Sequence, residues 1–113
     1  MLRFTPLFAA ALLVPAAAFA HHGWSSYDAS KPIDVSVKLQ EVRWANPHGS
    51  ATAVYNKQRW NIVLAPVSRM EARGLTRKML GKPVRLVGYP RSDGTREMRI
   101  ERVVAAGKTI ELR

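Results

Sequence analysis

Three histidines have positions that would let them act together on a metal ion. If a peptidase cuts the chain after Ala20, the new terminal amine and the imidazole of His21 can bind one ion as a chelate. The amide nitrogen and imidazole of His22 are further donors, and His48 can supply another imidazole nitrogen. Cu(II) prefers such tetragonal nitrogen ligands. The sequence therefore predicts a copper site formed by His21, His22 and His48.

The spacing leaves several alternatives open. Cleavage after Ala18 would expose Phe19-Ala20-His21, in which a histidine in third position binds copper or nickel with amide nitrogens. Zinc competes with copper, because its tetrahedral site could take two histidines, Asp28 and a water. The third alternative is that no metal binds, with a frayed N-terminus and with His48 only capping a turn.

Other site chemistry has little support in the sequence. Without cysteine, the chain has no disulfide or lipid-modified cysteine, and metal ligands must be nitrogen, oxygen or thioether sulfur. The methionines after position 1 stand at apolar positions and are expected to fill the core. Ser25, His22 and Asp28 are neighbours, but no strand-to-helix turn holds the serine. We therefore expect a binding protein, not an enzyme.

Residues 1–20 have the pattern of a cleavable export signal. Arg3 precedes an apolar stretch over residues 7–14, Pro15 breaks it, and small residues follow at the cleavage site. A retained membrane anchor is disfavoured, because this stretch falls short of the ~20 residues that a spanning helix needs. We expect a signal helix that is removed, leaving a periplasmic or secreted protein with no transmembrane segment.

The processed chain would be strongly basic. Removal of residues 1–20 takes away one of the 18 lysines and arginines, Arg3, and lowers the formal net charge from +10 to +9. A small basic protein attracts anions, but an exported one meets glycans, anionic lipids and small anions instead of nucleic acid. The basic residues are also scattered, which is typical of a solvated surface. We expect no nucleic-acid partner.

Alternation of apolar and polar residues predicts a mainly β domain. The first strand, residues 33–44, changes phase at Gln40-Glu41, which indicates a bulge. Between the third and fourth strands, residues 67–73 predict a short helix that Gly74 ends. This order favours a small OB-fold-like barrel of five to six strands. The later strands are expected at residues 50–55, 59–64, 84–89 and 98–105, with a terminal fragment at 109–112.

The predicted organisation is a signal peptide (1–20), an N-terminal arm (21–32) and an OB-like barrel domain (33–113). From His22 to Ile33 the arm spans at most ~36 Å, whereas a straight first strand carries His48 up to ~40 Å away. The arm must therefore fold back along that strand, unless the bulge bends it. Trp24 and Tyr27 offer large apolar surfaces that can hold the arm against the barrel.

The chain also resembles a family of small exported bacterial proteins of unknown function. The resemblance implies an exported, barrel-like domain and assigns no activity. It rests on Ala20-His21-His22-Gly23-Trp24, Tyr27-Asp28, residues 41–48 ending in Asn-Pro-His, Trp60, the helix end at 70–74, and residues 84–89.

Two functions follow from these features. The first is an exported copper-binding protein, a carrier or metal-tolerance factor, with zinc as the competing ion. The second is a metal-free interaction module, in which the OB-type face and the basic surface bind an anionic glycan, lipid or protein partner. We expect a monomer in either case.

Overall fold

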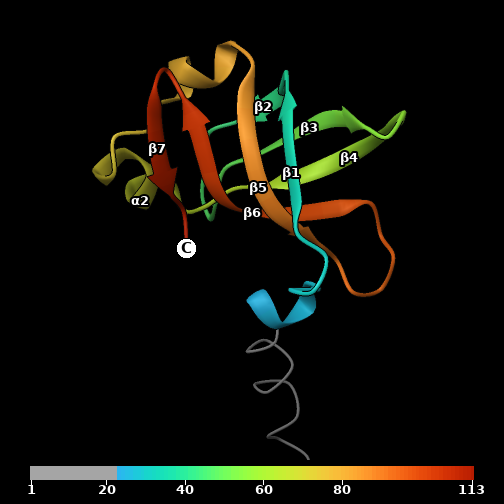
Figure 1. Cartoon of the computed structure of the whole chain (residues 1–113). Coiled ribbons are helices and arrows are strands. Elements are labelled where there is room, and N and C mark those ends of the chain that lie inside the picture. The colour runs from blue at the N-terminus through green and yellow to red at the C-terminus, as the bar shows by residue number, and fades with distance from the viewer. Residues whose placement is uncertain (1–22) are drawn as a thin grey trace, which may run out of the picture.

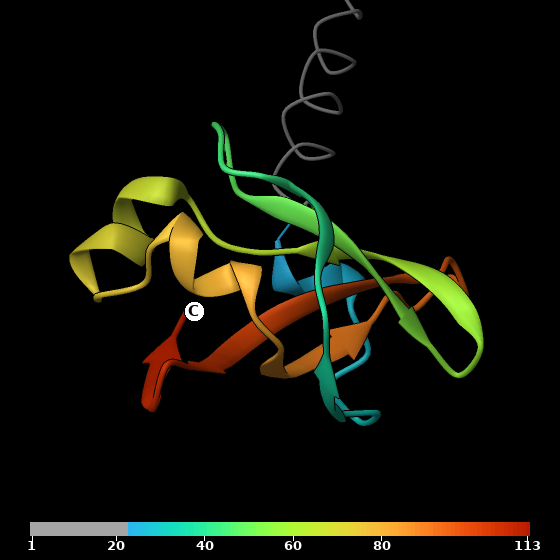
Figure 2. The same cartoon turned by 90° about the horizontal axis from the view of Figure 1, so that it is seen from above.

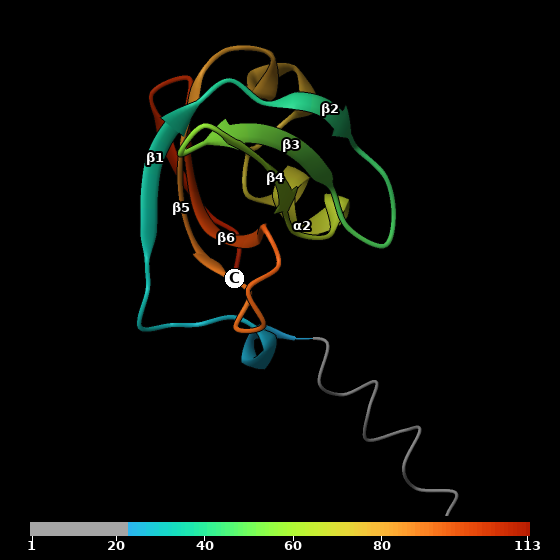
Figure 3. The same ribbon diagram turned by 90° about the vertical axis from the view of Figure 1, so that its right-hand side faces the viewer.

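A computed structural model describes residues 23–113, so the expected signal peptide and two of the predicted ligands, His21 and His22, lie outside the described residues. The described chain forms seven strands, which make one sheet curled into a half-barrel, and one short α-helix (Figures 1 and 3). The expected mainly β, barrel-like class is confirmed, as is the short helix between the third and fourth expected strands.

The elements follow the expected order along the chain. A short 3-10 helix, η2 (Trp24–Ser26), precedes the first strand, and α2 (Val67–Ala72) and η3 (Arg77–Gly81) stand between the fourth and fifth strands. The strands are β1 (Ile33–Val37), β2 (Gln40–Arg43), β3 (Ser50–Tyr55), β4 (Gln58–Val63), β5 (Val84–Pro90), β6 (Glu97–Ala105) and β7 (Lys108–Glu111).

The expected bulge divides the first predicted strand into β1 and β2. The register against β3 shifts between Gln40 and Arg43, and Glu41 has a φ of 50°. β1 pairs with β5 while β2 pairs with β3, so this one segment contributes both ends of the sheet order β1-β5-β6-β4-β3-β2. The division adds one strand to the six expected at most, and the expected terminal fragment is β7, which pairs with β6.

The core fills the inside of the curl. Alternate residues of β5 and β6 are buried there, among them Leu86 and Ile100, because a strand turns successive side chains to opposite faces. Met70 of α2 and Met98 of β6 are fully buried, which confirms them as core residues. Seen from above, α2 and η3 lie at one side of the sheet while the β3–β4 hairpin projects at the other (Figure 2).

Gly88 lies at a close approach of β5 and β6. The register between the two strands shifts at Val87 and Gly88. A Cβ at position 88 would lie 2.4 Å from the Arg99 carbonyl oxygen and 2.9 Å from Cδ1 of Ile100. The backbone oxygen cannot move aside, so only glycine fits here.

We expect Gly88→Ala to lower the free energy of unfolding by about 3 kcal/mol, because the added methyl group overpacks the β5–β6 contact. Gly81→Ala is the matched control: a Cβ there meets no atom within 4 Å, and a change within about 0.5 kcal/mol is expected. Urea unfolding of the two variants measures the difference. Equal stabilities would show that the close approach imposes no constraint.

Candidate ligand-binding cleft

The N-terminal arm lies against the end of β5, next to the start of β1. Asp28 N–H donates to the Pro90 carbonyl at 2.8 Å, and Ser92 N–H donates to the Ser26 carbonyl at 3.0 Å. These bonds place the arm beside the loop between β5 and β6 (Figure 1). The arm therefore stays at the end where β1 starts, opposite Gly88, and does not return along that strand. The second expected possibility holds instead: the bulge bends the first predicted strand and shortens the path to His48.

Trp24 anchors this part of the arm. Its ring makes edge-to-face contacts with Tyr27 and Tyr89, at centroid distances of 6.4 and 6.2 Å. The guanidinium carbons of Arg99 and Arg113 lie 4.5 and 4.6 Å from the Trp24 ring centroid. Aromatic and cation–π contacts of this kind each contribute about 0.5–1.5 kcal/mol. Together they hold the arm on β5 and β6.

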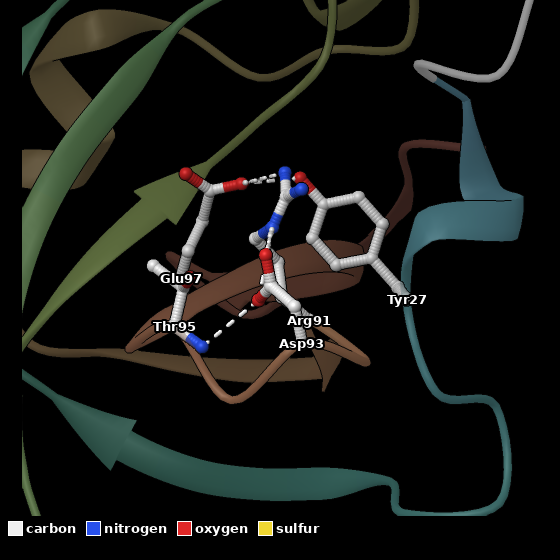
Figure 4. A network of polar contacts seen from close by, with 5 residues as sticks. All are labelled: Tyr27, Arg91, Asp93, Thr95 and Glu97. Carbon is white, nitrogen blue, oxygen red and sulfur yellow. Dashed lines mark hydrogen bonds and ion pairs between the residues drawn. The ribbon is translucent and has the colours of Figure 1, made fainter.

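Tyr27 joins a polar network that reaches across to β6 (Figure 4). Its hydroxyl donates to Glu97 Oε2 at 2.6 Å, and Arg91 Nη1 lies 3.4 Å from the same oxygen. Arg91 also contacts Asp93 at 3.3 Å, and Asp93 accepts a hydrogen bond from Thr95 N–H at 2.9 Å. The network fixes the β5–β6 loop and the arm relative to one another.

This environment changes the titration of the phenol. Burial, followed by the hydrogen bond and charge of Glu97, raises the pKa of Tyr27 to about 12, although Arg91 and Arg99 act in the opposite direction. Both the burial and the negative charge disfavour the phenolate. Tyr27 is therefore a neutral hydrogen-bond donor at physiological pH.

The turn that carries His48 is fixed by its neighbour Gly49. Gly49 N–H donates to the Ala65 carbonyl, and its own carbonyl accepts from Leu64 N–H, both at 2.9 Å. A Cβ at position 49 would lie 2.8 Å from Cε of Met70, so the turn packs closely on α2. The expected Asn46-Pro47-His48-Gly49 turn thus has a defined position, with a cis bond between Asn46 and Pro47.

His48 and Tyr27 line the same cleft. Its volume is about 440 Å³, and it lies between the arm, the β2–β3 turn and the start of β6. The exposed imidazole of His48 has Nδ1 3.0 Å from the Gly49 carbonyl oxygen. The residues that line the cleft are Tyr27, Pro47, His48, Val63, Arg91, Glu97 and Arg99.

A second hollow, of about 370 Å³, continues the cleft over β3 and β4. It shares His48, Val63 and Glu97 with the first. The exposed guanidinium of Arg43 lines it and makes no ion pair with a carboxylate of residues 23–113. Glu41, in contrast, is paired with Arg59. The two hollows together form a concave surface with basic groups at both ends.

Of the predicted metal ligands, only His48 belongs to the described residues. Asp28, weighed as a zinc ligand, binds within its own turn, where it accepts two hydrogen bonds from Ser30. Within residues 23–113, no group of three His, Cys, Asp or Glu side chains could hold a metal ion. Glu97 and Arg91 were not singled out from the sequence, since neither is part of a motif.

Comparison with known proteins places the chain in a family. A family model described as "Family of unknown function (DUF6152)" matches residues 10–99, the greater part of the chain. The chain belongs to this family. The DUF6152 match includes the β2–β3 turn and the β5–β6 loop, which form the cleft, and it agrees with the resemblance to a family of unknown function. No curated protein matches the chain.

Within residues 23–113, no helix is long and apolar enough to cross a membrane.

We expect Glu97→Gln to lower the pKa of Tyr27 from about 12 towards its ordinary 10.0 without reaching it, because burial persists. Spectrophotometric titration of the phenolate, with Tyr27→Phe to assign the transition, measures this pKa. The raised pKa also makes the Tyr27 contribution to stability complete below pH 10 and lost between pH 10 and 12.

The matched control is Glu101→Gln. Glu101 accepts a hydrogen bond from Tyr89, not from Tyr27, at 3.1 Å, so this change should leave the Tyr27 transition in place. A Tyr27 pKa that stays near 12 in Glu97→Gln would rule out the carboxylate as a cause of the shift.

Proposed function

We propose that this chain is an exported, periplasmic or secreted binding protein that holds Cu(II) through His21, His22 and His48. The processed N-terminus would supply the amine and the adjoining donors, and His48 would supply an imidazole nitrogen. The observation that supports this proposal is that Tyr27, in the arm, and His48, in the β2–β3 turn, line one cleft.

The length of the arm is compatible with the proposal. His22 is five residues before Tyr27, and five residues span at most about 18 Å. The cleft that Tyr27 and His48 share is therefore within range of the N-terminal donors. A straight first strand would have separated them, but the bend between β1 and β2 shortens the path.

The hydrogen bond of His48 also suits a ligand role. When Nδ1–H donates to the Gly49 carbonyl, Nε2 carries the lone pair that binds a metal. Metal-binding histidines commonly have this second hydrogen bond, which sets the tautomer and the orientation of the ring.

The charges in the cleft bear on the choice of ion. Glu97 is already engaged by Tyr27 and Arg91, so nitrogen atoms are the principal donors, which favours copper over harder ions. Arg91 and Arg99 oppose the approach of a cation. Deprotonation of the His22 amide on copper binding would offset this repulsion.

We expect processed protein to bind Cu(II) more tightly than a version with one extra residue before His21, because the extra residue removes the amine from the chelate. His48→Ala should weaken binding by at least about tenfold, the lower range for lost metal-site groups. Isothermal titration with Cu(II), and separately with Zn(II), measures both effects, and mass spectrometry confirms the N-terminus.

Asn61→Ala is the control for the cleft, because Asn61 lines the adjoining hollow but carries no imidazole. It should bind Cu(II) as the unchanged protein does. Equal affinity in the processed, extended and His48→Ala proteins would refute the copper site.

The arginines support a second candidate, a metal-free OB-like module that binds an anionic glycan, lipid or protein partner. Arg43, Arg91 and Arg99 line the two connected hollows, and Arg43 has no acidic partner among residues 23–113. Such a ligand would be released by salt, since exposed ion pairs are screened. Retained binding after alanine replacement of all three histidines would favour this candidate over copper.

A further inference from the structure

Three segments that are distant in the sequence meet at the end of the strands opposite the cleft. They are the β1–β2 bend (38–39), the segment with η3 (76–83) and the β6–β7 turn (105–108), all near the top of Figure 1. Lys38 Nζ donates to the Gly81 carbonyl at 2.7 Å, and β1 ends opposite the start of β5. The β6–β7 turn reaches the same end, because Arg85 pairs with Val104.

These segments carry only positive charge. None of them contains an aspartate or glutamate, and the side chains of their basic residues are exposed. None makes an ion pair with a carboxylate of residues 23–113. We call this surface the basic pole, and its cations are Lys38, Arg77, Lys78, Lys82 and Lys108.

The basic pole also contains a small apolar hollow. Its volume is about 280 Å³, and Met79 and Ala106 line it between two lysines and Thr76. Met79 is only partly buried. Lysine keeps its charge in water while its hydrocarbon stem covers apolar surface. A hollow of this kind can receive a short apolar group from a ligand whose anionic part contacts the lysines.

We infer that the basic pole docks the protein on a bilayer that contains anionic phospholipid. Cations spread over three segments fit a plane of many headgroups better than a single bound anion, and each basic residue near such a surface adds to binding. The hollow fits the boundary between headgroup and acyl chain. Aromatic residues, on which single-stranded nucleic acids stack, are absent from all three segments.

Docking in this way would direct the cleft away from the membrane. The pole lies where β5 begins, at Val84, whereas the arm and Tyr27 pair with residues just beyond its end, at Pro90. A bound protein would therefore keep its ligand site open to the surrounding solution. The inference does not depend on copper, because no histidine belongs to the pole.

The test is cosedimentation of the protein with vesicles of phosphatidylglycerol and phosphatidylcholine, and with phosphatidylcholine alone. The pole variant replaces three exposed cations whose side chains make no ion pair within residues 23–113, and the control variant removes the same charge elsewhere. Both keep the same N-terminus, so any contribution from that end cancels. The pole variant is Lys78→Gln, Lys82→Gln and Lys108→Gln, and the control variant is Lys31→Gln, Lys57→Gln and Arg96→Gln, none of which lines the cleft.

We expect the partition coefficient on anionic vesicles to fall at least about tenfold in the pole variant and much less in the control. Binding should weaken with salt and be negligible on neutral vesicles. Equal losses in the two variants would show that only net charge acts and would overturn the inference. So would equal binding to both vesicle types, or preferential binding to a DNA duplex.

Folding is checked by circular dichroism. If the pole variant is unfolded, Lys78→Glu and Lys82→Glu, each alone, replace it, and Lys57→Glu is their control. A single charge reversal at the pole that leaves vesicle binding equal to that of Lys57→Glu would likewise overturn the inference.

Discussion

The cleft depends on one interaction, the attachment of the N-terminal arm to the start of β6. Tyr27 reaches Glu97 across 70 sequence positions, and Arg91 shares the same carboxylate oxygen. The Trp24 contacts hold the arm on β5 and β6, and this bond, with the backbone bonds beside it, directs Tyr27 into the cleft that His48 also lines. Because the hydroxyl is half-buried and its acceptor is charged, the bond is among the stronger ones that a side chain can make. The arm becomes one wall of the cleft through this bond.

The bend between β1 and β2 is the second constraint, since it determines where the opposite wall stands. A straight strand would carry the turn with His48 far from the arm. The positive φ of Glu41 and the accompanying shift in register let the first half of the segment pair with β5 and the second half with β3. The curl that results brings the β2–β3 turn and the β5–β6 loop to one cleft, which Pro47, His48 and Arg91 line. Both walls therefore follow from the path of residues 23–43.

Sequence patterns predicted the strands well, because alternation and turn residues are local signals. The bulge at Gln40-Glu41, the helix end before Gly74 and the turn at Asn46-Pro47 were all visible in the residue order. The residues of the site were harder to predict from the sequence. His48 stood out by its type, but Glu97 and Arg91 acquire their role only when β6 lies beside the arm, a contact between distant residues. The basic pole could not be predicted for the same reason, because its lysines and arginine are scattered in the sequence and only the fold brings them together.

The basic residues at the two ends of the molecule therefore differ in whether they have acidic partners. At the cleft, Arg91 is paired with Glu97 and Asp93, so its guanidinium group is held by fixed partners. At the pole, lysines extend into solvent without acidic neighbours among residues 23–113, and they can adapt to a ligand that has no fixed shape. Arginine suits the first task because its planar group is held by directed hydrogen bonds, and lysine suits the second because its charge is compact and its stem flexible. The chain's choice of basic residue at each end is thus consistent with a shaped cleft at one end and a diffuse anionic surface at the other.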